Sequence, residues 1–298
     1  MTITAEAVKQ LRERTGAGMM ECKKALVEAG GDLDAAAELM RKQGLAKADK
    51  KATRLAAEGI IVTARSADGL SAALAEVNCE TDFVAREQDF RAFAAAVGEL
   101  ALANRTLETG ALLALKTPTG ETLEERRRAL IAKIGENITV RRVASITAPT
   151  ALGGYLHGTR IGALVALRGG DETLARDIAM HVAAMNPDFV KPADVPAELV
   201  AKEREIFAEQ VKAEGKPPEI AARMLEGKLR KRLNEISLIG QPFVKDDKMT
   251  VENLLKKAGA EVTAMVRFEV GAGLEKKQGD FAAEVMATVQ GATASARH

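Results

Sequence analysis

Residues 59–77 read GIIVTARSADGLSAALAEV, and this stretch decides the fold of the chain. Its first part, Gly59 to Ala64, is rich in β-branched residues, which favour strands. Asp68-Gly69 is typical of a two-residue hairpin turn, and Leu70 to Val77 is a second strand-like run. The stretch therefore predicts an antiparallel β-hairpin.

Helices and a further strand follow this hairpin. After a loop at residues 78–83, apolar residues from Phe90 to Leu100 keep helical spacing. Thr122-Leu-Glu-Glu fits a capping box, and Gly135 stands where that helix should end. The run from Ile138 to Ile146 is again strand-like. A hairpin, helices and a returning strand predict an α+β unit.

The same plan occurs again about ninety residues later in the chain. A hairpin turns at Gly158, Asp171 can cap the next helix, and alternating apolar residues from Val262 to Val270 predict another strand. We therefore predict a core of two related α+β subdomains with antiparallel sheets.

Purely helical segments flank this core. Residues 1–55 predict three short helices with Thr4 and Asp32 as N-caps, followed by a basic linker at 47–54. Two amphipathic segments around Gly215 to Pro218 predict a protruding helical hairpin or coiled coil at 187–235. Asp280 can cap a last helix. The predicted divisions are 1–55, 56–147, 148–186 with 236–272, 187–235, and a short C-terminal helical module at 273–298.

Composition and local sequence argue against several classes of protein. Forty-three basic residues against forty-two acidic ones leave a net charge of +1, which gives no support to direct nucleic-acid binding. Two cysteines form no disulfide framework, and no Cys and His residues have metal-ligand spacing. The N-terminus lacks the apolar core of a signal peptide, and no apolar run approaches the ~20 residues that cross a membrane. We expect a cytoplasmic protein without cofactor, metal or membrane.

An enzyme has little support in the sequence, which holds no phosphate-loop, dinucleotide or hydrolase motif. Cys79 with His157 or His181 as base is one alternative, although free Cys more often packs as a small apolar residue. His181 lies on an apolar helix face, which favours a packed or hydrogen-bonded role. For His157, at a hairpin tip, partner contact and a local role stand equal.

Two places resemble interaction surfaces. The second N-terminal helix should use Met19, Cys22, Leu26 and Ala29 as its core face. Met20, Lys23, Lys24 and Val27 then share another side, either a protein-binding surface or a solvated face, and spacing does not decide between them. Phe83 follows a strand beside Asp82. It is either a plug for its own core or a wedge for a partner, and spacing alone favours the plug.

Two long segments carry a family resemblance. VKQLRERTGAGMMECKKAL (residues 8–26) and EVNCETDFVAR (residues 76–86) closely resemble the two signatures of the elongation factor Ts family. KIGENITVRRV, HGTRIGALVA, HVAAMNPDFV, GQPFV and VRFEVGAG are similar to further family segments in the same order. The resemblance implies a three-helix N-terminal domain like ubiquitin-associated domains, two related core subdomains, an inserted coiled-coil or dimerisation hairpin and a C-terminal module.

The resemblance also implies a function without bond-making catalysis. Family members bind elongation factor Tu in its GDP-bound and nucleotide-free forms and promote GDP release, so that GTP can bind. The segment that disturbs the partner's magnesium and phosphate site matches Thr81, Asp82, Phe83 and Val84. The N-terminal region that contacts the nucleotide domain matches Met19, Met20 and Lys23, and His157 matches a part that faces another partner domain.

Two competing hypotheses stay open at this stage. One is a ribosome- or RNA-associated protein using the basic linker and Lys-rich helices, whose binding should fall steeply with salt. The other is a thiol enzyme with an activated Cys79. The sequence does not decide whether the helical hairpin dimerises, or whether a complex contains one or two copies of each partner.

Overall fold

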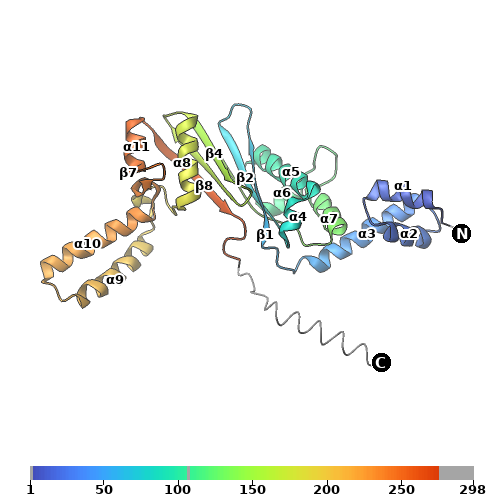
Figure 1. Cartoon of the computed structure of the whole chain (residues 1–298), viewed down its shortest axis with the longest axis horizontal. Helices are drawn as coiled ribbons and strands as arrows, with labels where there is room; N and C mark the ends of the chain where they lie inside the picture. Colours follow the sequence, from blue (N-terminus) through green and yellow to red (C-terminus); the bar gives the residue numbers. More distant parts are fainter. Residues whose placement is uncertain (1–2, 106–107, 275–298) are drawn as a thin grey trace, which may run out of the picture.

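The computed structural model describes residues 3–105 and 108–274. It is elongated, with a three-helix bundle at one end, a two-helix arm at the other and two three-stranded sheets between them (Figure 1). Both sheets are antiparallel, so the predicted α+β fold is confirmed. The last helix, predicted from Asp280, and nearly all of the predicted module at 273–298 lie outside the described residues.

The first sheet has the order β1-β2-β3, formed by β1 (Glu58–Arg65), β2 (Ser71–Cys79) and β3 (Thr139–Thr147). The predicted hairpin is confirmed: Gly69 adopts φ 70° at the turn, a conformation that glycine adopts without strain. The helices between β2 and β3 are α4 (Asp82–Arg86), α5 (Gln88–Asn104), α6 (Thr109–Leu113) and α7 (Leu123–Ile134). The predicted capping box at Thr122 and the left-handed C-cap at Gly135 are both present.

The second sheet has the order β4-β5-β8, formed by β4 (Ala151–His157), β5 (Ile161–Arg168) and β8 (Glu261–Glu269). Helix α8 (Glu172–Met185) begins at Asp171, whose carboxylate accepts the Leu174 N–H at 2.8 Å. The short elements before β8 are η1 (Pro192–Asp194), η2 (Leu238–Gly240), β6 (Pro242–Phe243), β7 (Asp246–Thr250) and α11 (Val251–Lys257). The sequence pattern did not predict these short elements.

The two sheets pack face to face, with helices on their outer faces. One apolar cluster lies between the first sheet and α5 and α7, and another between the second sheet and α8 and α11. A third joins the sheets through Ile61, Leu74, Leu152 and Leu164. Strand β2 is buried along its whole length because both of its faces are covered.

Helices α1 (Ala5–Thr15), α2 (Met19–Glu28) and α3 (Leu33–Lys51) form the N-terminal bundle around a small core of its own. The predicted caps Thr4 and Asp32 are confirmed. The predicted linker at 47–54 is wrong, because α3 continues to Lys51. Its second half packs on α7, and this tertiary contact keeps a polar, basic segment helical.

The predicted core face of α2 needs one correction. Cys22 and Leu26 are buried, and Ala29 packs against them, but Met19 is 57% exposed. The helix begins at Met19, so this residue stands at the edge of the bundle, beyond the reach of the core. Spacing of three residues is therefore necessary for a shared face but does not ensure burial.

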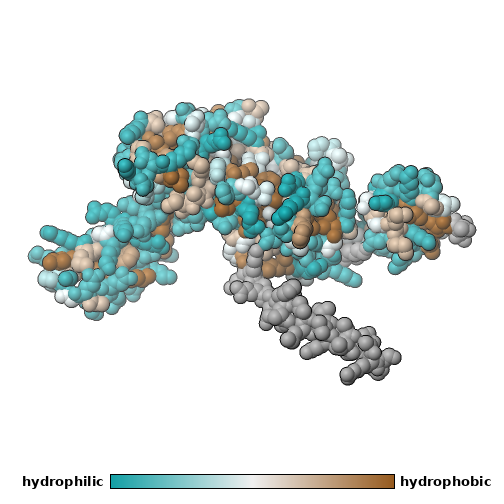
Figure 2. All heavy atoms as spheres, viewed as in Figure 1, coloured by the Kyte–Doolittle hydropathy of each residue, from teal (hydrophilic) through white to brown (hydrophobic). Residues whose placement is uncertain are grey.

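Helices α9 (Ala197–Ala213) and α10 (Pro218–Glu235) form the arm. They are separated at the predicted break, where Gly215 adopts φ 61° and Pro218 starts the second helix. Ion pairs cross between the helices, such as Arg232 to Glu203 at 3.3 Å. Figure 2 shows that hydrophilic residues cover much of the arm, with isolated hydrophobic residues among them.

Candidate functional site

The five-residue helix α4 exposes an aromatic side chain to solvent. Phe83 is 74% exposed, whereas Val84 and Ala85 are buried in the core of the first subdomain. Successive helical residues point about 100° apart, so anchoring Val84 and Ala85 turns Phe83 outward. The plug hypothesis for Phe83 is therefore wrong. Val84 belongs to the anchor of the turn.

The other two predicted residues of this segment have local partners. The Thr81 hydroxyl accepts the Val84 N–H at 3.5 Å and so caps α4. Asp82 is exposed in the first turn, and its carboxylate pairs with Arg86 at 2.7 Å. An exposed pair of this kind is weak and is readily broken in favour of another partner.

Cys79 lies at the end of β2, directly before this turn, and is buried. Burial, together with the nearby Glu136 and Glu58 carboxylates, raises the pKa of its thiol to about 12. Its sulfur also donates to the Thr81 carbonyl oxygen at 3.1 Å. Because the nucleophile of a thiol enzyme is the thiolate, this environment opposes the thiol-enzyme hypothesis.

Helix α2 carries a second exposed apolar surface. Met20 is 77% exposed, and Val27 and Lys23 are also exposed, as the pattern predicts. With Met19 they form a face that mixes flexible thioethers and an ammonium group, which suits protein binding. We call Met19, Met20, Lys23 and Val27 the α2 face.

His157 is exposed at the tip of the β4–β5 hairpin, where its Nδ1 lies 3.4 Å from the Tyr155 hydroxyl. Contacts through β1 place this hairpin near the α4 turn. Arg160, three residues beyond His157, pairs with Glu58 at 2.6 Å, and Glu58 is the strand partner of Cys79. The fold thus links His157 and Phe83, which are far apart in sequence, through one end of β1.

His181 is fully buried in α8, as expected of a packed, hydrogen-bonded histidine. Its Nε2 lies 2.9 Å from Gln241 Oε1, and its Nδ1 accepts the Val244 N–H at 3.1 Å. Burial lowers its pKa, although the bond to Gln241 opposes that shift. A neutral ring held on both sides is a structural element.

Sequence reasoning missed a buried charge in β2, on the face of this strand that packs toward the second sheet. Glu76 in β2 is 0% exposed, and its carboxylate accepts from Arg141 at 3.0 Å, Arg142 at 2.6 Å and the Gly271 N–H at 2.8 Å. Burial would raise its pKa, but these donors outweigh burial and lower it. The only indication in the sequence is that Glu76 lies two positions after Leu74 and so shares the inward-facing side of the strand.

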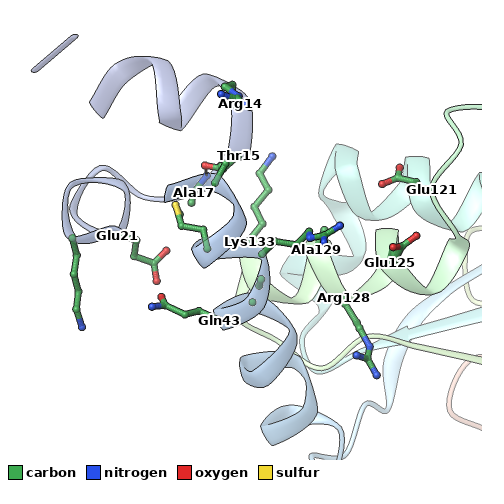
Figure 3. A pocket seen from close by; sticks show the side chains of 16 residues that line it. Arg14, Thr15, Ala17, Glu21, Gln43, Glu121, Glu125, Arg128, Ala129 and Lys133 are labelled. Carbon is green, nitrogen blue, oxygen red and sulfur yellow. Dashed lines mark hydrogen bonds between the residues drawn. The ribbon is translucent and has the colours of Figure 1, made fainter. Parts of the chain in front are cut away.

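A cleft of about 820 Å³ lies between the N-terminal bundle and α7. Figure 3 shows Arg14, Glu21 and Gln43 on one wall and Glu125, Arg128 and Lys133 on the other. Several of these side chains already have partners: Arg14 with Asp34, Arg128 with Glu124 and Lys133 with Asp89. The cleft contains neither Phe83 nor Met20, so it is separate from both exposed surfaces.

An exposed aromatic side chain on a turn anchored in the core is a candidate anchor for protein binding. Comparison with known proteins gives the class, since the family model described as elongation factor TS matches residues 80–272. The chain is 57% identical to elongation factor Ts of Alkalilimnicola ehrlichii, covering 98% of this chain and 100% of that protein. It is 56% identical to elongation factor Ts of Halorhodospira halophila (97% and 99% covered) and 57% identical to that of Methylococcus capsulatus (97% and 99% covered).

The chain is therefore a translation elongation factor. It belongs to the elongation factor Ts family, as the two sequence signatures predicted. This family is the nucleotide-exchange factor for elongation factor Tu. Among the described residues, no helix is long and apolar enough to cross a membrane.

Proposed function

We propose that this chain binds GDP-bound elongation factor Tu and disturbs its magnesium and phosphate site through the α4 turn. GDP then leaves and GTP can bind. The observation that carries the proposal is the 74% exposure of Phe83 on a turn whose neighbours are anchored in the core. An aromatic ring of this size gains most when buried in a partner's pocket, which makes it a candidate hot spot.

Disturbing the ion's site is an effective way to release the nucleotide. A bound Mg²⁺ is often the largest local charge in a phosphate site, so its displacement weakens several contacts at once. In the proposed complex Phe83 enters between partner helices, and Asp82 exchanges its weak pair with Arg86 for contacts to the partner. Thr81 and Val84 hold the backbone of the turn.

Exchange of this kind is a coupling between two binding events. If the chain weakens GDP binding by some factor, GDP weakens binding of the chain by the same factor. The chain therefore needs a surface that binds the nucleotide-free state best, and no catalytic side chain of its own. The raised pKa of Cys79 agrees with this proposal.

Two further surfaces complete the proposed interface. The α2 face would contact the nucleotide domain of the partner, and His157 with its hairpin would face another partner domain. Lys23 adds a positive charge to the first of these contacts, which favours a faster, salt-dependent encounter.

The hypothesis of RNA association is less favoured by the positions of the basic residues at 47–54. Lys51 donates to the Gly135 carbonyl oxygen, and Arg54 pairs with Glu80 at 2.6 Å. Two of the four basic residues at 47–54 are thus already paired within the molecule and join the N-terminal bundle to the core.

The proposal includes the predicted domain boundaries and the cytoplasm as the place where the protein acts.

The arm is the proposed surface for self-association, because Ile206 and Ile220 on it are exposed. Sedimentation velocity over a hundredfold concentration range tests this, with an Ile206→Lys, Ile220→Lys double variant as control. A monomer at every concentration would reject self-association.

The test of the proposed function is release of a fluorescent GDP analogue from elongation factor Tu in a stopped-flow instrument. We expect the release rate to rise with the concentration of this protein. A folded sample that leaves the rate unchanged, with a matched partner, would reject the proposal. Salt titration of RNA binding would then decide whether the RNA hypothesis holds.

A further inference from the structure

The four-residue loop between α7 and β3 (residues 135–138) lies against the backbone that carries Phe83. The carboxylate of Glu136 in this loop accepts three hydrogen bonds from two consecutive residues. These come from the Glu80 N–H at 3.1 Å, the Thr81 N–H at 3.0 Å and the Thr81 hydroxyl at 2.6 Å. Hydrogen bonds to a charged acceptor are the stronger kind, so the bonds to Glu136 hold this backbone firmly.

The two segments bind each other in both directions. Glu80 Oε1 accepts the Asn137 N–H at 2.6 Å, while its other oxygen pairs with Arg54 at 2.6 Å. Each carboxylate thus accepts backbone N–H groups from the opposite segment. The pair closes a link between residues 80–81 and 136–137, which are 55 or more positions apart in sequence.

The link between residues 80–81 and 136–137 stabilises helix α4. A single five-residue turn of helix is unstable alone. Its N-cap hydroxyl, on Thr81, donates to Glu136 and accepts from the Val84 N–H, so Glu136 orients the cap. Phe83 is too exposed for its own packing to fix its direction.

We propose that Glu136 is a positioning residue for Phe83. It holds the α4 turn so that the ring already points outward before the partner arrives, which lowers the ordering cost of binding. Glu136 acts through the turn, and its proposed role in exchange rests on the proposed function of Phe83.

A double-mutant cycle tests this role with GDP release as the measurement. Glu136→Gln keeps the side-chain volume but replaces one acceptor oxygen with a donor, and we expect a loss of about tenfold in the release rate. In a Phe83→Ala background the same change should cost less than about twofold, because the two residues act as one unit. A loss of equal size in both backgrounds would overturn the proposal.

Met20→Ala provides the matched control background. It removes an exposed apolar side chain from a surface that Glu136 does not contact, so the losses should multiply. If Glu136→Gln does not fold, Thr81→Val is the alternative variant. It removes the hydroxyl that donates the shortest of the three hydrogen bonds to Glu136. Thr81→Val should then show the same coupling to Phe83 and none to Met20, and the absence of that pattern would contradict the proposal.

A second measurement needs no partner and so separates this inference from the proposed function. The chain contains no Trp, so Phe83→Trp introduces a single indole at the turn. We expect Glu136→Gln to lower the time-resolved fluorescence anisotropy of that indole through faster local motion, measured well below the unfolding temperature of the variant. Unchanged anisotropy would overturn the positioning role even if exchange is confirmed.

Discussion

The α4 turn and the α2 face both expose apolar side chains, but they are supported differently. Behind the α4 turn lie the large core of the first sheet and the bonds to Glu136. Behind the α2 face lies a small bundle core, in which none of the buried residues that the structure describes is larger than Leu. Phe83 is therefore presented by a braced segment, and Met20 by a small, separate unit. Exposure alone does not distinguish Phe83 from Met20. We expect the structure behind each side chain to determine how much that side chain contributes to GDP release.

The largest effect should be on stability, at the buried carboxylate of Glu76 between the two sheets. Glu76→Gln removes the buried carboxylate between Arg141 and Arg142, and we expect the free energy of unfolding to fall by about 3 kcal/mol. Urea denaturation at neutral pH measures this. Glu261→Gln is the matched control, since its pair with Arg168 is exposed and should change stability by less than about 1 kcal/mol. Equal losses would contradict the importance of burial.

The same variant gives a pH dependence with a definite sign. The pKa of Glu76 is lowered below its ordinary value of 4.5, so the unfolded chain binds the proton more readily. Its contribution to stability is full above pH 4.5 and is lost as the pH falls through the lowered pKa. The gap in stability between the native chain and Glu76→Gln should therefore narrow below pH 4.5.

The next largest effect should be on exchange. Phe83→Ala should lower the GDP-release rate at limiting factor by roughly 30-fold, equivalent to about 2 kcal/mol. Its unfolding temperature should not change, because the ring contributes little to the core. Val244→Ala, a change at another exposed apolar side chain that lies outside every proposed interface, should leave the rate unchanged. If the Phe83→Ala variant accelerates GDP release as well as the native chain does, the α4 turn is not the segment that enters the partner.

A smaller effect is expected at the α2 face. Met20→Ala should lower the rate by roughly fivefold, about 1 kcal/mol, because a flexible thioether on a small unit gives a less ordered contact. The same stopped-flow assay checks it. A loss larger than that of Phe83→Ala would reverse the comparison between the two surfaces.

The smallest effect is expected at the β4–β5 hairpin. His157→Ala should change the release rate by about twofold, since the imidazole is exposed and has only a 3.4 Å contact with Tyr155. Tyr155→Phe, which removes the hydroxyl and keeps the ring, is its control. A loss of tenfold or more in His157→Ala would place the hairpin among the main contacts.

Sequence reasoning succeeded where local rules determine structure. The hairpin at Asp68-Gly69, the caps at Thr4, Thr122 and Asp171, and the break at Gly215 each depend on a few neighbouring residues. The same is true of the exposed Met20 and Lys23, which helical spacing separates from Cys22 and Leu26. Short-range chemistry is visible in a single sequence.

Sequence reasoning failed where contacts between distant parts of the chain determine the structure. The helical state of 47–51 depends on packing against α7, where Gly44 lets the helices approach until an added Cβ would lie 3.1 Å from that of Ala132. The N-cap of the α4 turn is bound by Glu136, and the carboxylate of Glu76 accepts hydrogen bonds from groups up to 195 positions away. No periodicity contains such information.

The arm leaves the body at two points that are hydrogen-bonded to each other. The Leu238 N–H donates to the Phe189 carbonyl oxygen at 2.8 Å, and the Phe189 N–H donates to that of Ile236 at 3.2 Å. These hydrogen bonds hold the two ends of the inserted arm together. The number of residues in the arm therefore adds little to the conformational entropy that folding costs. We expect residues 197–235 to be exchangeable as a cassette, which makes the arm a site for grafting a fluorescent domain without altering the sheets.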